Sequence, residues 1–175
     1  MSGAVTEQDQ GARDLLARVR ALSGGRTVRV GVLADAPKRE EKPSARGKPS
    51  KKARIREKVA RRAAPSLLEV AIIHEFGAGP VPARSFIRAT LDEKRAEILK
   101  LQVALAQQVL LGKLTPEQAL GQLGAKVASM CQARIVAGIA PPLAASTLRR
   151  KGNKITPLIL TGQLKSSITF AVEGA

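Results

Sequence analysis

The chain has 175 residues, enough for one domain or two small ones, and 30 Lys and Arg against 14 Asp and Glu give it a net charge of +16. Its aliphatic content argues against full disorder, and no apolar run reaches the roughly 18 residues of a membrane span. One Cys, Cys131, and one His, His74, exclude an internal disulfide and a Cys-based zinc site. The first residues contain no predicted secretion signal. With only three Phe, base-stacking folds for single-stranded nucleic acid are disfavoured.

The first predicted elements are a helix and a strand. Apolar residues recur at helical spacing from Thr6 to about Leu22, and Gly24 and Gly25 end the helix. From Thr27 to Leu33 the sequence alternates and is β-branched, which predicts a strand. The helical stripe consists of Leu15, Leu16, Val19 and Leu22.

A basic segment follows, from Pro37 to Ala64. It holds twelve Lys and Arg and three Glu, a net charge of +9, and almost nothing apolar. Such a segment buries too little surface to offset its ordering entropy, so residues 37–50 are expected to form a mobile loop. Residues 51–64 are expected to become helical if an anionic partner neutralises their charge. Two interpretations stay open: a solvated solubility or localisation patch, or an arm that contacts phosphates or an acidic partner.

The candidate contact residues for a partner or for DNA are the cations of this segment and of a second, smaller basic loop. They are Lys38, Arg39, Lys42, Arg46, Lys48, Lys51, Lys52, Arg54, Arg56, Lys58, Arg61, Arg62, Arg149, Arg150 and Lys151.

Three further helices are predicted after the insert. Ser66 and Glu69 form a capping box that begins a helix from Leu67 to about Glu75, ended by Gly77. A long helix runs from about Ser85 to Leu111. Thr115, Pro116 and Gln118 then begin a second long helix to about Ala137, antiparallel to the first. The predicted buried positions are Ile87, Leu91, Ile98, Leu101, Leu105 and Val109 on the first and Leu120, Leu123, Val127, Met130 and Arg134 on the second.

The C-terminal region predicts a tight turn or short helix over Gly162–Ser166 and a strand over Ile168–Val172. Two strands separated by helices indicate an α+β domain in which the strands pair. The expected fold is therefore a single domain over residues 1–175: a small antiparallel sheet packed with a long antiparallel helical hairpin, plus the flexible basic insert 37–64.

No catalytic or cofactor motif is complete. His74 and Glu75 lack the second His that a zinc protease needs at position 78, which is Ala. Gly77 and Gly79 follow a helix, and position 82 is Pro, so a dinucleotide loop is excluded. Cys131 lies inside a helix and is expected to be buried and structural. The sequence predicts no enzyme, no metal site and no cofactor.

Two segments carry a more specific signal. Residues 73–88 read IHEFGAGPVPARSFIR. Residues 139–152 read IAPPLAASTLRRKG, and residues 157–168 read PLILTGQLKSSI. In order and spacing, this pair resembles the neck, tail-completion or virion-morphogenesis proteins of tailed bacteriophages. That family typically shows "(N/H)EFG…(I/V)P.RPF(I/L)R" before a long helix and "P.a.sTl.rKg…kPLidTGqLr.SI" near the C-terminus. Ser85 replaces the family's usual Pro, and Leu160 replaces its usual Asp.

The resemblance assigns structural roles to the matching residues. Phe86 is expected to anchor the long helix in the core with Arg84 and Arg88 outside, and Leu164 is expected to point inward with Gln163 and Lys165 outward. The motif residues so assigned are His74, Glu75, Phe76, Gly77, Pro82, Arg84, Phe86, Arg88, Thr161, Gly162, Gln163 and Leu164.

The resemblance also implies a function. The protein would be a structural virion component that joins head to tail as a homo-oligomeric ring, expected to be a hexamer. Its partners would be a portal, adaptor or stopper protein and a tail terminator or tail tube, with no membrane involved. It would lie at the neck of the virion, and in the host cytoplasm during assembly. The basic arm would face the genomic DNA or an acidic partner. The alternative is a nucleic-acid-binding protein that grips phosphates through residues 38–62.

Overall fold

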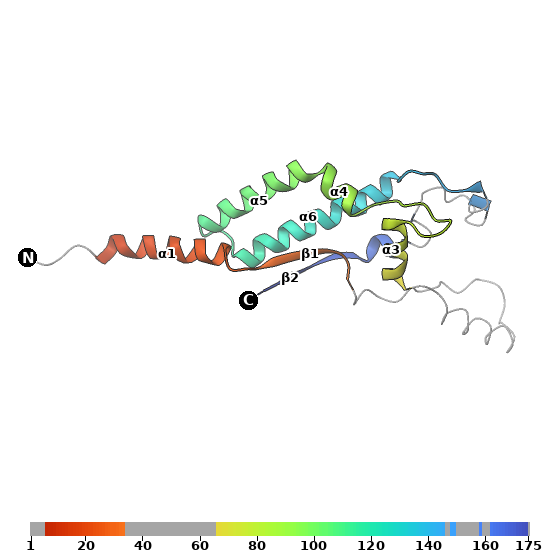
Figure 1. Ribbon diagram of the computed structural model, residues 1–175. Helices are drawn as coiled ribbons and strands as arrows, with labels where there is room; N and C mark the ends of the chain where they lie inside the picture. The colour runs from red at the N-terminus through yellow and green to blue at the C-terminus, as the bar shows by residue number, and fades with distance from the viewer. Residues whose placement is uncertain (1–5, 34–65, 146–147, 150–157, 159–161, 175) are drawn as a thin grey trace, which may run out of the picture.

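The computed structural model describes residues 6–33, 66–145, 148–149, 158 and 162–174. Within them the fold is α+β, as expected (Figure 1). The predicted insert 37–64, with its candidate residues from Lys38 to Arg62, lies outside the described residues, as do Arg150, Lys151 and Thr161. The elements are α1 (Thr6–Leu22), β1 (Thr27–Val32), α3 (Leu67–Phe76), α4 (Arg88–Glu93), α5 (Arg95–Leu110), α6 (Pro116–Ala137), α8 (Gln163–Ser166) and β2 (Ile168–Glu173).

The two strands form an antiparallel pair, as predicted, with Thr27 opposite Glu173 and Val32 opposite Ile168. Alternate side chains face opposite sides of such a ribbon. Val28 and Val30 pack against the core. On the solvent side Arg29 forms an ion pair with Glu173. The ribbon is covered on one face by α6, which packs against both strands.

A helical hairpin makes up the rest of the body (Figure 1). Both predicted capping boxes are present, at Ser66 for α3 and at Thr115 for α6. The first long helix differs from the prediction because it is interrupted at Lys94, whose ψ of 8° departs from helical geometry. The result is a short α4, beginning at Arg88, followed by α5.

The core lies between α6, the sheet and the α4 region. Phe86, Val109, Cys131 and Ile135 are its largest fully buried side chains. The predicted buried positions Leu105, Val109, Leu123 and Val127 are confirmed.

Several predicted core assignments need correction. On the first long helix Leu91 is exposed, and Ile87, Ile98 and Leu101 are only half-buried. On α6 the predicted positions Leu120, Met130 and Arg134 are only half-buried. The buried stripe of α6 also contains Ala119, Gly124, Ala128, Cys131 and Ile135. The buried face of α6 is centred on small residues because the helix lies very close to the sheet there. A β-carbon on Gly124 would lie 2.7 Å from Phe170 and from Val28. The helix therefore approaches the sheet on its small-residue side rather than on its leucine side.

The first helix, α1, projects from one end of the body (Figure 1). It packs against α5, where Arg18 Nη1 donates to the carbonyl of Leu110 at 3.1 Å. Its predicted apolar stripe is largely uncovered: Leu15, Leu16 and Val19 are 48, 54 and 45% exposed. The helix is confirmed, but its apolar face does not join the core.

Candidate functional site

The carboxylate of Glu75 organises the first motif segment. Glu75 is the second-last residue of α3 and is buried. It accepts hydrogen bonds from Ser85 Oγ at 2.6 Å and from the backbone amides of Phe86, Ile87 and Arg88 at 2.8, 3.1 and 2.9 Å. These amides open α4, and amides at a helix start have no partner within the helix. A side chain from α3 therefore caps α4.

The guanidinium of Arg88 completes this cluster. Its Nε lies 3.2 Å from Glu75 Oε1, and its Nη2 donates to the Glu75 carbonyl at 2.9 Å. Burial raises the pKa of Glu75, but the hydrogen bonds from Ser85 and from the amides outweigh it, so the pKa lies below its ordinary value. The carboxylate is ionised at neutral pH and surrounded by donors. It is thus a structural acceptor rather than a general base.

Arg84 lies inside the protein, contrary to the expectation that it points outward. Its side chain is buried, and its Nε and Nη2 donate to the carbonyls of Pro141 and Pro142 at 2.8 and 3.1 Å. Its backbone amide donates to the carbonyl of His74 at 2.6 Å. A buried guanidinium needs acceptors for its donors. Here they come from the second motif segment, so Arg84 joins the two segments.

The second segment also meets the first through α8. This short helix packs against α3 and β2. Leu164 is buried, as expected, and Ser167 Oγ donates to its carbonyl at 2.8 Å. Gln163 and Lys165, expected outside, are half-buried. Gly162 precedes the helix with a φ of 81°, a conformation that favours glycine.

Gly77 redirects the chain between α3 and the capped turn. Its φ is 79°, and a β-carbon there would lie 3.0 Å from the amide nitrogen of Ala83. Ala78 and Val81 then exchange two backbone hydrogen bonds of 3.0 Å across a tight turn. Glycine is therefore required both by conformation and by space. Pro82, which follows, is exposed.

Ser85 replaces the Pro that the family pattern shows, and its hydroxyl takes part in the cluster. Besides donating to Glu75, Ser85 Oγ accepts from the amide of Ala89 at 3.1 Å. A serine hydroxyl at a helix start satisfies an otherwise unpaired amide. This departure from the pattern thus keeps the local structure intact.

The sequence analysis assigned no partner to Arg134. In the structure this residue of α6 binds the turn that contains Ser85. Its Nε donates to the Ser85 carbonyl at 3.2 Å, and its Nη1 donates to Glu93 Oε2 at 2.5 Å. The hydrogen bond from Arg134 lowers the pKa of Glu93. An arginine on an otherwise apolar helix face was the available signal, and it could have been interpreted as a buried partner for a loop carbonyl.

The two motif phenylalanines have opposite environments. Phe86 is fully buried, as expected, whereas Phe76 is 61% exposed. The Arg88 guanidinium lies 4.3 Å from the centre of the Phe76 ring, within cation–π distance. Arg88 is exposed on its outer side, as expected. The motif therefore presents one aromatic ring and one cation to solvent.

Cys131 has the environment of a structural thiol. It is buried, as expected, and burial raises its pKa, so it is a neutral thiol at neutral pH. Over the described ranges no group of three or more His, Cys, Asp or Glu side chains is placed to hold a metal ion. Nor does any helix among those residues have the length and apolarity to cross a membrane.

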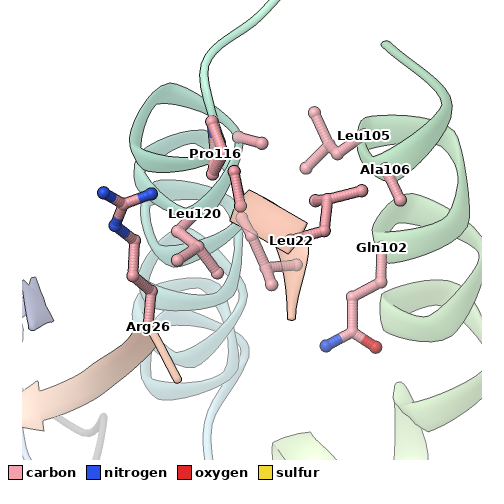
Figure 2. Close-up of a pocket in the computed structure, with 10 residues that line it drawn as sticks. Leu22, Arg26, Gln102, Leu105, Ala106, Pro116 and Leu120 are labelled. Carbon is pink, nitrogen blue, oxygen red and sulfur yellow. The ribbon is translucent and has the colours of Figure 1, made fainter. Parts of the chain in front are cut away.

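A small apolar pocket lies between the end of α1, α5 and the start of α6 (Figure 2). It encloses about 160 Å³, below the usual volume of small-molecule sites, which is about 300 Å³ or more. In Figure 2, Arg26 and Gln102 lie on opposite sides, Leu22 and Leu120 lie between them, and Leu105 lies above Gln102. The pocket suits an apolar side chain better than a reacting substrate.

Comparisons of the chain with protein-family models, with curated proteins and with solved structures find no match. The site is therefore defined by its geometry: two distant segments meet at the α3 end of the molecule, through Arg84 and through the contact between α3 and α8. Of the sequence-predicted basic contact residues, Arg149 is the one within the described ranges, and it is exposed.

Proposed function

We propose that this protein is a structural virion component of a tailed phage or prophage. It joins head to tail as part of a homo-oligomeric ring at the neck, expected to be a hexamer. Its proposed neighbours are a portal, adaptor or stopper protein on one side and a tail terminator or tail tube on the other. The protein acts by presenting surfaces and performs no catalysis.

One observation carries this proposal: the two segments that resemble the phage family form one structural unit. Arg84 of the first segment donates to Pro141 and Pro142 of the second. Glu75 uses its carboxylate to cap α4 instead of leaving it available for chemistry. The polar residues of the motif thus hold the two segments together, which supports a role in joining rather than in chemistry.

Deleting the gene from the phage or prophage that encodes it tests the proposal. We expect filled heads and free tails that fail to join, visible by electron microscopy, with joining restored by the wild-type chain. We also expect the chain in purified virions by mass spectrometry. Joined, infectious particles made without the protein would contradict the proposal.

The second candidate, a nucleic-acid-binding protein, is favoured by charge. Residues 37–64 contribute +9 of the net +16. Phosphate contacts by Lys and Arg release counterions, so affinity for duplex DNA would fall steeply with salt. Tight binding by the free chain that is lost on deleting residues 38–62 would support this candidate. Head–tail joining that survives the same deletion would support the neck function.

A further inference from the structure

A groove runs beside the C-terminal end of α1, where this helix meets α5 and the start of α6. Its first part is the apolar pocket of about 160 Å³ drawn in Figure 2, and its second part is a neighbouring cavity of about 300 Å³. Ala21 and Pro116 line both parts, so the two adjoin. Together they form a surface, the α1 groove, to which the two motif segments do not contribute.

The first part of the α1 groove has an aliphatic lining. Leu22, Leu105, Leu120 and Leu123 line it, and Leu22 is 39% exposed. None of the lining residues is aromatic, so this part offers no ring on which a nucleic-acid base could stack. It therefore fits an apolar side chain that another protein inserts.

Three cations and no carboxylate line the groove. Arg26 lines the apolar part, and Arg18 and Lys113 line the second part. Arg18 Nη1 donates to the carbonyl of Leu110 at 3.1 Å, and a β-carbon on Gly112 would lie 2.9 Å from Arg18 Nη2. The guanidinium is therefore held over the turn between α5 and α6. It has five N–H donors, so it can bind a further acceptor in the groove.

Other charges near the α1 groove do not reverse its sign. The exposed charged residues within four positions of a lining residue along the chain are the acids Asp14 and Glu117 and the bases Arg20, Arg29, Lys100 and Lys126. Arg29 is neutralised by its ion pair with Glu173. The amides of Thr115 and Gln118 at the start of α6 are already bonded in the capping box. The lining cations therefore determine which charge the groove attracts.

The composition of the lining limits the kind of partner. Most lining residues belong to helices, whose backbone groups bond within the helix, so the groove recognises side chains and offers no free strand edge. An amphipathic helix is the usual occupant of an apolar groove of this type. A second copy of this chain is disfavoured because each copy carries a net charge of +16.

We propose that the α1 groove binds an acidic amphipathic helix of another protein. A Leu or Phe of that helix fills the apolar part, and Asp or Glu residues three or four positions away bind Arg18 and Lys113, because such positions lie side by side on a helix. Opposite charges steer the two surfaces together. The contact is small, and contacts that bury less than about 1,200 Å² in total are typical of reversible complexes.

Synthetic helical peptides test this proposal on the full-length chain. The probe peptide has Leu at every third or fourth position and Glu on its other face. One reference peptide has Lys in place of Glu, and the other has Ala in place of Leu. Fluorescence anisotropy measures the three dissociation constants. We expect the probe to bind about tenfold more tightly than either reference, because binding needs both the carboxylates and the apolar row.

Two variants locate the binding at the groove. Lys113→Glu reverses a charge of the second part, and Ala106→Leu fills the apolar part. Each should weaken binding of the probe about tenfold. Arg95→Glu makes the same change of charge at an exposed position of α5 that does not line the groove. This matched control should leave the dissociation constant within about twofold. Circular dichroism melting curves show whether each variant folds.

Equal binding of the probe and a reference peptide, equal losses for Lys113→Glu and Arg95→Glu, or no binding would overturn the proposal. Duplex DNA whose binding both groove variants weaken as much as that of the probe would identify a phosphate site and overturn it too. The gene deletion tests the joining function separately. Joined virions without the protein remove that function and leave the groove, whereas unjoined heads without peptide binding do the reverse.

Discussion

The two ends of this molecule are stabilised in different ways. At the α3 end, a buried carboxylate and a buried guanidinium are each surrounded by hydrogen-bond partners, and segments more than fifty residues apart are joined. At the α1 end, a helix with an apolar stripe touches the body near its C-terminus. Buried charges are tolerated when every polar atom is satisfied, and they fix one geometry. The comparison separates an end held together by hydrogen bonds between distant segments from an end whose apolar side chains the other described residues leave uncovered.

Removing the carboxylate should have the largest effect. Glu75→Ala leaves the amides of Phe86, Ile87 and Arg88 without their acceptor and removes the ion pair with Arg88. A buried donor left without its acceptor costs about 1–3 kcal/mol, so losing the acceptor of three amides should lower the free energy of unfolding by about 3–5 kcal/mol. Urea denaturation measures it. Glu97→Ala, which removes an exposed pair with Lys94, is the control and should cost under about 0.5 kcal/mol. Equal losses for the two variants would contradict the role of the Glu75 cluster.

The two motif phenylalanines give a matched pair. Phe86→Ala should destabilise the protein by about 3–5 kcal/mol, because the ring is fully buried and leaves a cavity. Phe76→Ala removes a ring that is 61% exposed and a cation–π contact, so it should cost about 1 kcal/mol or less. Thermal melting of both variants checks this order, and a melting shift near zero for Phe86→Ala would be inconsistent with the core described above.

Two glycines of α6 test the approach of the helix to the sheet. Gly124→Ala places a β-carbon 2.7 Å from Phe170 and Val28, so it should cost about 1–3 kcal/mol through overpacking. Gly121→Ala has its nearest neighbour at 3.9 Å and should gain up to about 1 kcal/mol from helix propensity. Denaturation midpoints that move in opposite directions are expected. A stabilised Gly124→Ala would show that α6 lies farther from the sheet.

Acid should weaken the α3 end selectively. The pKa of Glu75 is lowered from 4.5 in the folded protein, so its contribution is fully present above that value and is lost as pH falls below it. The stability of the wild-type chain, measured in urea on both sides of pH 4.5, should therefore fall more steeply than that of Glu75→Gln. Parallel curves would mean that another carboxylate controls acid unfolding.

The smallest effect is expected at the α1 end. Leu16→Gln replaces a side chain that is 54% exposed, so the free energy of unfolding should change by no more than about 0.5 kcal/mol. A loss of several kcal/mol in a monomeric chain would mean that α1 belongs to the core after all.

Local signals in the sequence were sufficient for most elements of the fold, although they did not predict the break at Lys94 that separates α4 from α5. The capping residues Ser66 and Thr115 begin α3 and α6 as predicted, and the alternating segments form the two strands. Hydrogen-bond partners that lie far apart in the sequence could not be predicted from it. Arg84 was expected outside because its acceptors, two proline carbonyls, lie 57 and 58 residues further on. The buried stripe of α6 was misplaced because leucine spacing outweighed the small residues around Gly124 in the prediction.

The arginine contacts at the base of the hairpin have a mechanical consequence. The side chain of Arg84 connects the segment before α4 to the chain after α6 by hydrogen bonds. The side chain of Arg134 connects α6 to Ser85 and to Glu93. The hairpin is therefore closed at both ends, by the turn between α5 and α6 and by these two side chains. Separating α4 from α6 at this end would require breaking the hydrogen bonds of both arginines.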